Sequence, residues 1–321
     1  MTSTMSPRLL FVAALCAVSL VAYDASSASP QNAQPIDATK GQVFKSQSEL
    51  VVLHANVFDH HSDAVPDLAQ EQFAVFEDDR QQEITFFSRE DVPVAVGLVV
   101  DNSSSMIARY GMVVAGAMAF ADSSHPEDEL FTVHFNEHVR PGLPPQILFT
   151  SSRPQLRAAF AAMKPGGKTA LHDAVIDALD RVGHAKHQKH VIIVLSDGED
   201  NASHYTQKEM YDRAVRSNVM IYTVATDDGT RGGNAKPEVL RKLAKIGGGL
   251  VYFPRVDADV VRAFTEIARN VRRGYSIGYT PSNTSRDGAF RRVKVTVRVP
   301  GRKLTVRCRD GYTAPGPSSA Q

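Results

Sequence analysis

Cysteine, net charge and long apolar stretches are all scarce in this chain of 321 residues. Cys16 and Cys308 are the two cysteines, and only Cys308 remains if the first is removed with a leader peptide, which excludes an intramolecular disulfide. The formal net charge of +1 creates no field that would steer the chain towards nucleic acid. We therefore expect no nucleic-acid partner. Without a disulfide, the fold must be stabilised by the packing of its hydrophobic core, and 43% hydrophobic residues are enough to form one.

An apolar run near the N-terminus is too short to span a bilayer. It extends over residues 9–22, follows Arg8, and is followed by the small residues 26–29. A comfortable span needs roughly 20 residues. The order of basic, apolar and small residues is that of a secretory signal, which we predict at 1–28. We expect an exported protein of the periplasm, cell surface or medium, without a stable transmembrane span after cleavage; an uncleaved anchor is the alternative.

The rest of the chain divides into segments by composition. Residues 29–48 are polar and predict a linker, and 314–321 predict a disordered tail. Short alternating strands predict a β segment at 49–91 (strands 50–58, 73–77 and 84–87) and another at 273–313 (275–279, 290–299 and 304–309). We expect these two flanks to pack together as one small accessory β unit.

Residues 92–272 alternate strands with helices. The strands are expected at 94–100, 129–135, 146–149, 190–195, 219–225 and 250–253, with 146–149 at the edge. The helices are expected at 107–121, 153–163, 170–182, 207–216, 237–246 and 257–272. This alternation predicts an α/β fold, with a Rossmann-like, doubly wound and mostly parallel sheet.

Oxygen-bearing side chains follow two of the valine-rich strands. Asp101, Ser103 and Ser105 end the first, Asp197 ends the strand at 190–195, and Thr169 opens a helix between them. The carboxyl ends of parallel strands form the ligand-binding edge of such a sheet. Two carboxylates and three hydroxyls, without cysteine or histidine, favour Mg²⁺, with Mn²⁺ or Ca²⁺ as alternatives. Since the hydroxyls are neutral, the ion should attract one further carboxylate from outside.

These residues stand in three spaced motifs, Asp-x-Ser-x-Ser at 101–105, Gly-Gly-Lys-Thr-Ala-Leu around Thr169, and Ser-Asp-Gly-Glu-Asp around Asp197. Together they resemble the metal-ion-dependent adhesion site (MIDAS) of von Willebrand factor type A (VWA) domains in all five ligand positions. The resemblance covers about residues 92–272 and implies a Rossmann-like sheet with the ion at its top. It also implies that Asp197 reaches the metal through water and that a partner's acidic residue completes the shell.

The flanks resemble a subgroup of secreted bacterial proteins related to this family. The pattern FxVxEDxxxQxI occurs at 73–84, YxxGYxP at 275–281 and GYxAP at 311–315. Around the metal we expect a rim formed by Asn102, Ser104, His172, Glu199 and Asp200. In the second β segment Arg292, Lys294 and Arg298 alternate with valines, which is typical of a solvated strand face rather than an anionic-surface patch.

The function indicated is an exported, adhesion-type binding module that captures an Asp or Glu of a partner protein through a divalent ion. One alternative is a metal-assisted hydrolase. It needs a positioned base or nucleophile, but the sequence has neither Gly-x-Ser-x-Gly nor His-Glu-x-x-His, and nothing in it orients Ser104 or His172. We therefore predict no enzyme and no catalytic residue. A second alternative is a structural envelope protein whose ion only stabilises the fold.

Deletion of residues 31–92 tests the predicted accessory unit. If the two flanks share one core, the shortened chain exposes the apolar face of its C-terminal strands and loses solubility and thermal stability. Soluble yield and the melting temperature measure this. A fully soluble and equally stable remainder would contradict the shared unit.

Overall fold

The computed structural model describes residues 50–61, 63–89, 91–226 and 234–317. The predicted signal segment and linker lie outside these residues, as do the last four residues of the predicted tail. Residues 47–321 belong to one unit by their mutual contacts. Within it an α/β part and an antiparallel β part are built from different stretches of the chain.

The α/β part contains one six-stranded sheet, in the order β10-β9-β8-β5-β6-β7. Its strands are β5 (Ala95–Asp101), β6 (Glu129–Phe135), β7 (Val139–Pro141), β8 (His190–Ser196), β9 (Val219–Ala225) and β10 (Val251–Tyr252). All pairs are parallel except β6 with β7. After β6 and β7 the chain returns to the other side of β5 to form β8. The strand order therefore reverses between β5 and β8, where open α/β sheets bind ligands.

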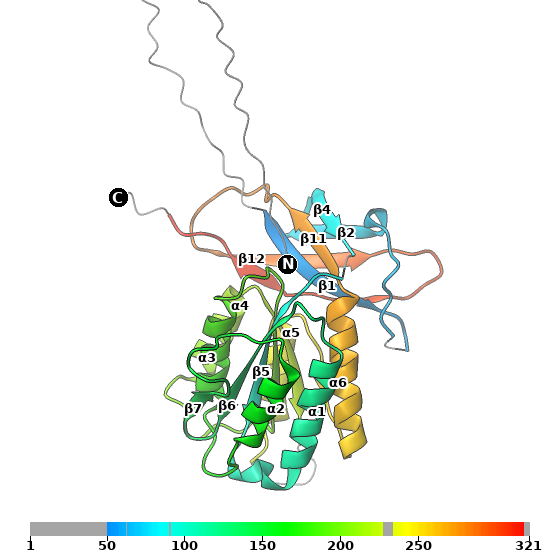
Figure 1. Cartoon of the computed structure of the whole chain (residues 1–321). Coiled ribbons are helices and arrows are strands. Elements are labelled where there is room, and N and C mark those ends of the chain that lie inside the picture. The colour runs from blue at the N-terminus through cyan, green and yellow to red at the C-terminus, as the bar shows by residue number, and fades with distance from the viewer. Residues whose placement is uncertain (1–49, 62, 90, 227–233, 318–321) are drawn as a thin grey trace, which may run out of the picture. The chain divides into compact units, whose positions relative to one another are not determined.

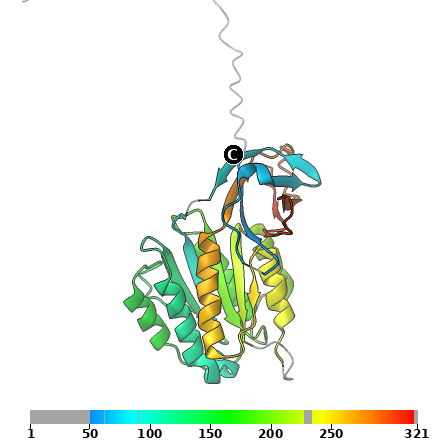
Figure 2. The same ribbon diagram turned by 90° about the vertical axis from the view of Figure 1, so that its right-hand side faces the viewer.

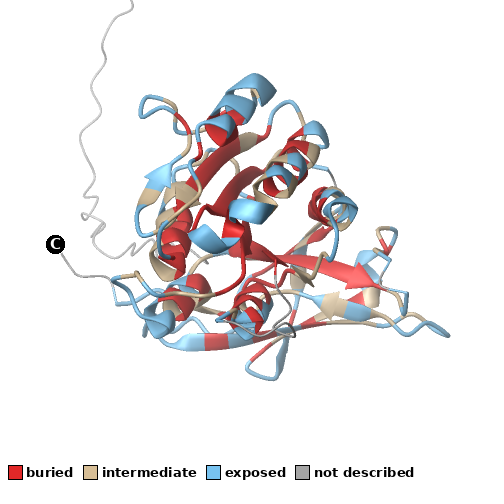
Figure 3. Ribbon diagram, turned by 90° about the horizontal axis from the view of Figure 1, so that it is seen from below, coloured by how far each residue is buried: buried red, intermediate tan, exposed pale blue. Residues whose placement is uncertain are grey.

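Helices cover both faces of this sheet (Figure 1). They are α1 (Tyr110–Asp122), α2 (Arg153–Ala161), α3 (Leu171–Val182), α4 (Gln207–Arg216), α5 (Pro237–Ile246) and α6 (Asp257–Arg272), and a 3₁₀ turn, η2 (Ser104–Arg109), precedes α1. Successive residues of β5 serve opposite cores: Val96 and Leu98 belong to the core under α1 and α6, and Ala95 and Val99 to the core under α3, α4 and α5. Figure 3 shows the buried strands between helices whose outer faces are exposed. The predicted fold class is confirmed.

The stretch Ser104–Asp122 is long and apolar enough to cross a membrane by length and composition alone. In the fold its apolar side chains pack into the core of the α/β part. Val113, Ala117 and Phe120 are buried in the core that α1 shares with α6. Packing against the sheet thus accounts for the apolar character of this segment.

The two flanks form a pair of antiparallel sheets, in the orders β13-β1-β11-β4 and β14-β12-β2-β3. Their strands are β1 (Val51–Phe58), β2 (Phe73–Glu77), β3 (Arg80–Gln82), β4 (Ile84–Ser88), β11 (Tyr275–Tyr279), β12 (Phe290–Val297), β13 (Thr305–Arg307) and β14 (Gly311–Thr313), and η1 (Gln70–Gln72) precedes β2. One core joins both sheets, with Leu53 and Ile277 from the first and Val75 and Val293 from the second. The expected accessory β unit is confirmed as a sandwich to which both flanks contribute.

Polar contacts tie this sandwich to the end of the α/β sheet where the parallel strands begin. The Asn56 side-chain amide donates to the Tyr222 hydroxyl at 2.9 Å, and both residues are buried. At the end of α6, Arg272 pairs with Asp91 at 3.0 Å and with the buried Asp128 next to β6. Figure 2 shows α6 leading directly into the sandwich. The carboxyl ends of the parallel strands therefore remain free of the sandwich.

Several element predictions are wrong in detail. The expected edge strand at 146–149 is absent; the edge strand is β7, and only Thr150 forms an isolated bridge with Leu130. The turn that Ile147 closes by donating its N–H to the Pro144 carbonyl prevents pairing there. Pro141 is tolerated at an edge because its missing N–H interrupts no ladder. The first part of the helix expected at 107–121 is the 3₁₀ turn η2, and α1 begins at Tyr110.

The short strands β3 and β14 were not predicted, because three residues carry too little periodicity. The tail is also more ordered than expected at its start. Ala314 is buried and donates its N–H to the Ala289 carbonyl at 2.9 Å. The four residues 314–317 therefore do not belong with the predicted disordered tail, whose remainder lies outside the described residues.

Two glycines of α1 form a matched pair for testing the contact with α6. A Cβ at Gly116 would lie 2.6 Å from Cδ2 of Phe264 and 2.7 Å from Cγ1 of Val260, whereas a Cβ at Gly111 would meet nothing within 4 Å. Phe264 and Val260 are fully buried in the core, so moving them aside would disturb its packing. We expect Gly116→Ala to destabilise the fold by about 1–3 kcal/mol. Gly111→Ala should be neutral or stabilise it by up to about 1 kcal/mol. Urea unfolding measures both; equal effects would contradict the close packing.

Candidate metal centre

Asp101 ends β5 with its carboxylate fixed at both oxygens. It is 1% exposed. Oδ1 accepts from the backbone N–H of Ser103 at 2.9 Å, and Oδ2 accepts from the hydroxyl of Ser196 at 2.7 Å. Ser196 is the last residue of β8, the strand that pairs with β5. The reversal of strand order thus brings this carboxylate next to the loop that carries Asp197.

The two serine hydroxyls of the same loop lie side by side. Ser103 Oγ and Ser105 Oγ are 3.1 Å apart; Ser103 is buried and Ser105 exposed. Two adjacent ligands of an octahedral ion with bonds of about 2.1 Å lie about 3 Å apart. The spacing of these hydroxyls therefore fits neighbouring positions on a small divalent ion.

Hydrogen bonds attach the Thr169 loop to both carboxylate loops. The N–H of Gly166 donates to the Asn102 carbonyl at 2.8 Å, and the N–H of Ser104 donates to the Gly167 carbonyl at 3.1 Å. On the other side, the Thr169 carbonyl accepts from the N–H groups of Asn201 and Ala202 at 2.9 and 3.0 Å. Thr169 itself is 3% exposed. The three predicted loops are thus joined, although they are far apart in the chain.

The loop needs glycine at position 167. Gly167 has a φ of +86°, which L side chains rarely adopt, and a Cβ there would meet the Glu137 carboxylate at 1.7 Å. That carboxylate also accepts from the N–H of Lys168 at 2.9 Å. A side chain at this position would therefore shift the segment that leads to Thr169.

Asp197 places a second carboxylate near the first. It is 6% exposed, and its Oδ1 accepts from the N–H of Glu199 at 3.0 Å. The pKa of Asp101 is raised from 3.8 to about 6, first because burial removes water from its carboxylate and also because Asp197 repels its negative charge. No basic side chain is among the groups that act on this pKa. The site is therefore short of positive charge.

These residues fit a divalent cation. All donors are oxygen, two carboxylates stand close together without a basic partner, and the hydroxyls of Ser103 and Ser105 are adjacent. Asn102 adds a buried Oδ1 that has no hydrogen-bond partner. A hard cation relieves this excess of acceptors and of negative charge. Among the residues that the structure describes, no group of three or more His, Cys, Asp or Glu side chains offers another metal site.

The predicted rim residues surround this centre in different ways. Asn102 is buried and donates to the Lys164 carbonyl at 3.0 Å, while Ser104 is exposed. Asp200 accepts from the N–H of His172 at 3.0 Å, and His172 Nδ1 lies 3.1 Å from the Tyr205 carbonyl. The interpretation that nothing orients His172 is therefore wrong.

Ser196, Asn136 and Asn201 support the ligands; sequence reasoning expected Asn201 to order the rim of the site, and it missed Ser196 and Asn136. The side-chain amide of Asn136 donates to the Gly166 carbonyl at 3.0 Å, and the backbone carbonyl of Asn136 accepts from the N–H of Ala170. Asn201 accepts from the N–H of Thr169 at 2.8 Å. Of the two missed residues, only Ser196 could have been found from the sequence, because it directly precedes Asp197 in the third motif.

The sequence model of the von Willebrand factor type A domain matches residues 96–266, which is more than half of the chain. The chain belongs to the VWA family. The matched segment runs from β5 into α6 and contains all five residues predicted to bind the metal. No curated protein matches the chain.

One solved structure shows the same fold at low sequence identity, and two others have a lower similarity. A von Willebrand factor type A protein from Catenulispora acidiphila is 15% identical, with a TM-score of 0.50, and the match covers 86% of this chain and 76% of that one. The vWF domain of the type V pili tip protein Mfa5 from Porphyromonas gingivalis is 15% identical, with a TM-score of 0.47, over 56% of this chain and 95% of that one. Proximal thread matrix protein 1 from the mussel byssus, with a zinc-occupied MIDAS motif, is 16% identical, with a TM-score of 0.47. The match covers 61% of this chain and 49% of that one.

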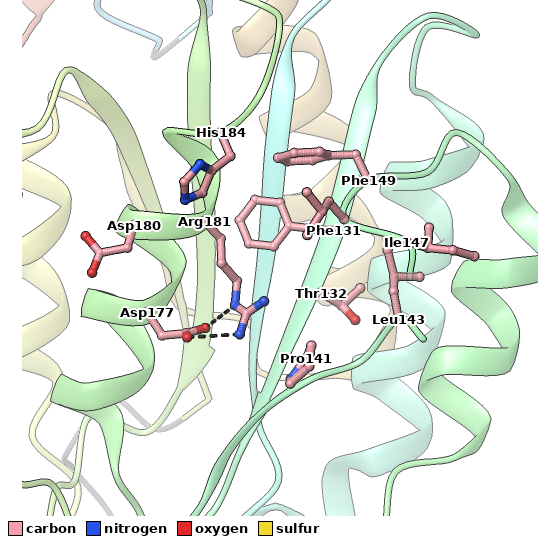
Figure 4. Close-up of a pocket in the computed structure, with 11 residues that line it drawn as sticks. Phe131, Thr132, Pro141, Leu143, Ile147, Phe149, Asp177, Asp180, Arg181 and His184 are labelled. Carbon is pink, nitrogen blue, oxygen red and sulfur yellow. Dashed lines mark hydrogen bonds and ion pairs between the residues drawn. The ribbon is translucent and has the colours of Figure 1, made fainter. Parts of the chain in front are cut away.

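A hollow on one flank of the VWA domain (Figure 4) is lined by none of the five predicted ligands. Its volume is about 290 Å³, and it lies between β6, β7 and the second half of α3. Phe131 and Phe149 meet there edge to face, with centroids 5.6 Å apart. Arg181 already pairs with Asp177 through two hydrogen bonds. This hollow therefore adds no group to the metal centre.

The raised pKa of Asp101 predicts how the metal-free VWA domain depends on pH. Because the folded state holds this proton more tightly than the unfolded state, stability falls as the pH rises from about 4 through 6. We expect metal-free Asp101→Asn to be about 1–3 kcal/mol more stable than wild type at pH 8, and nearly equal to it at pH 4.5.

Urea unfolding at both pH values, after removal of divalent ions, measures the difference. Glu127→Gln is the control, because it also removes one negative charge, but an exposed one, at the opposite end of the strands, where β6 begins. An Asn variant less stable than wild type at pH 8 would show that the buried charge does not destabilise the metal-free fold.

Proposed function

We propose that this chain is an exported binding module whose MIDAS holds a divalent cation, Mg²⁺ foremost, and captures an Asp or Glu carboxylate of a partner protein. The ligands would be Asp101, Ser103, Ser105, Thr169 and Asp197. The observation that carries the proposal is the pair of adjacent carboxylates without a basic partner, surrounded by neutral hydroxyls. Export rests on the signal pattern at 1–28.

Charge balance explains why a partner's carboxylate is the expected ligand. If Asp197 acts through water, Asp101 is the one carboxylate in direct contact and leaves the ion with an uncompensated positive charge. Ser105 is exposed, so this side of the centre is accessible from solution. An incoming carboxylate would balance this charge and at the same time supply an oxygen ligand to the ion.

The surface beside the centre also suits a protein partner. Ile107, in η2 next to Ser105, is 59% exposed. Tyr205 is 50% exposed, and the first turn of α3 holds it, since its N–H donates to Asp173 and its carbonyl lies beside His172. An aromatic and an aliphatic side chain beside a charged anchor are typical of protein interfaces.

A metal-assisted hydrolase is the second candidate, and the orientation of His172 is the observation that favours it. With Nδ1 beside the Tyr205 carbonyl and 3.4 Å from Asp200, the ring is held as a base would be. No hydrogen bond joins His172 to Ser104 among the described residues. Turnover of ester or phosphoester substrates that Asp101→Ala and His172→Ala both abolish would establish this activity and replace the binding proposal.

Asp101→Ala separates the binding module from a protein whose ion is purely structural. We expect this variant to lose Mg²⁺ binding in calorimetry and to lose the capture of partners from envelope extract, while it keeps its fold by circular dichroism. Glu127→Ala should capture as wild type does. A large fall in the melting temperature of Asp101→Ala, with capture by wild type unaffected by chelator, would favour the structural ion.

A chemical treatment of the extract tests the carboxylate directly. Carbodiimide coupling of the partner's carboxylates to a neutral amine should abolish Mg²⁺-dependent capture, because the ion then meets no anionic ligand. Acetylation of the partner's lysines should leave capture intact. Capture that survives carbodiimide would contradict recognition of an acidic residue.

A further inference from the structure

The hollow beside β7 (Figure 4) has walls of aromatic and aliphatic side chains. Phe131 and Leu143 belong to the core under α3, α4 and α5, and Ile147 and Phe149 pack against that core. The volume of about 290 Å³ is nearly twice the roughly 150 Å³ of a cavity that binds benzene, so a molecule of one or two rings fits. We call it the aromatic hollow.

A glycine in the neighbouring strand sets the position of the Phe131 ring. Gly97 of β5 pairs with Phe131 of β6, and a Cβ at Gly97 would lie 2.4 Å from Cζ of Phe131. The end of the ring therefore lies over β5, where another residue would place its side chain. Phe149 meets this ring at an interplanar angle of 89°, with centroids 5.6 Å apart. Two rings at right angles form a corner against which a third aromatic ring can pack in a favourable geometry.

Another wall comes from the segment 146–149, which does not form the expected strand. Because Ile147 donates its N–H to the Pro144 carbonyl at 2.9 Å, the chain turns here, and Ile147, Leu148 and Phe149 border the hollow. Leu148 is 63% exposed, and among the large exposed apolar side chains of the described residues it is the only one that lines the hollow. A stable protein interface needs a far larger contact area. The hollow therefore suits a small molecule rather than a protein surface.

The charged side chains at the border of the hollow are already paired. Arg181 donates two hydrogen bonds to Asp177, and Arg213 of α4 pairs with Asp180. These acidic and basic groups balance, so a ligand gains nothing from a net charge. His184 is exposed and lines the hollow, and within the described parts of the chain its imidazole has no hydrogen bond or ion pair. A neutral imidazole offers one donor and one acceptor, so it can bind one polar group of a ligand.

We propose that the aromatic hollow binds a small neutral aromatic molecule that carries one N–H or O–H group, as indoles and phenols do. The ring of the ligand packs on Phe131 and Phe149, and its polar group bonds to the imidazole of His184. Binding removes apolar surface of both the ligand and the hollow from water, which drives the association. None of the predicted metal ligands lines the hollow, so this site is independent of the proposed metal-dependent capture.

Protein-observed NMR of the full chain tests the proposal with two probes of equal shape, in slightly alkaline buffer, which keeps histidine neutral. Indole carries an N–H group, and indene is its hydrocarbon counterpart without one. We expect saturable binding of indole with a dissociation constant of about 0.1–1 mM. The shift changes should centre on Phe131, Ile147 and Phe149, because these residues surround the bound ring.

Phe149→Ala removes one ring of the hollow from a partly exposed position, so the fold should persist. We expect it to weaken the binding of both probes by about tenfold, because the ligand loses one of its two aromatic contacts. Phe290→Ala is the matched control, since it removes the same ring from an exposed position of β12 that does not line the hollow. It should bind both probes within about twofold of wild type. Urea unfolding checks that both variants keep their fold.

His184→Ala separates the polar contact from the packing. It should weaken indole by about two- to tenfold and leave indene unchanged, because only indole donates a hydrogen bond to the imidazole. His138→Ala is the control, an exposed histidine of the same domain that does not line the hollow. Absence of saturable binding of both probes, shift changes away from the hollow, or equal weakening by a variant and its control would overturn the proposal. Equal weakening of indole and indene by His184→Ala would contradict the polar contact.

Discussion

A negative charge held out of water at the end of β5 is the constraint on which the candidate metal centre depends. Asp101 is buried, its two oxygens are fixed by Ser103 and Ser196, and Asp197 adds a second charge close by. Such a pair destabilises the fold unless a proton or a cation accompanies it. The loops around it are hydrogen-bonded to one another, so they cannot separate to relieve the repulsion. The arrangement therefore favours ion binding over local relaxation.

The two ends of the parallel sheet have different surroundings. At the carboxyl ends, the carboxylates of Asp101 and Asp197 lie close together without a basic partner. At the other end, a cavity is lined by basic and acidic side chains from both the α/β part and the sandwich. The sandwich supplies one wall of this cavity, through β13 and the end of β1, which pair with each other. The accessory strands thus contribute a surface of their own rather than merely covering the VWA domain.

The hydrophobic periodicity of the sequence predicted the elements in which apolar and polar side chains alternate regularly over many residues. The bounds expected for α4, α5 and α6 agree with the structure, and Asp101 and Asp197 lie at the strand ends where the valine runs placed them. The three-residue strands β3 and β14 carry too few repeats, and a proline-rich turn displaced the edge strand from 146–149 to β7. The contacts of Ser196, Asn136 and Asn201 depend on strand order and loop docking, which no local pattern contains. The cavity between α6 and the sandwich depends on the pairing of β1 with β13 in the same way.

The interleaving of the flanks has a consequence for the order in which the protein can mature. β1 lies between β11 and β13, so Val51 pairs with Tyr279 and Phe58 with Thr305. β1 therefore has no strand partner until the segment that begins at Tyr275 has been synthesised. Contacts of such large sequence separation form slowly. A sandwich that closes only through pairings of such large sequence separation stays open for longer than the α/β part, whose neighbouring strands are closer along the chain.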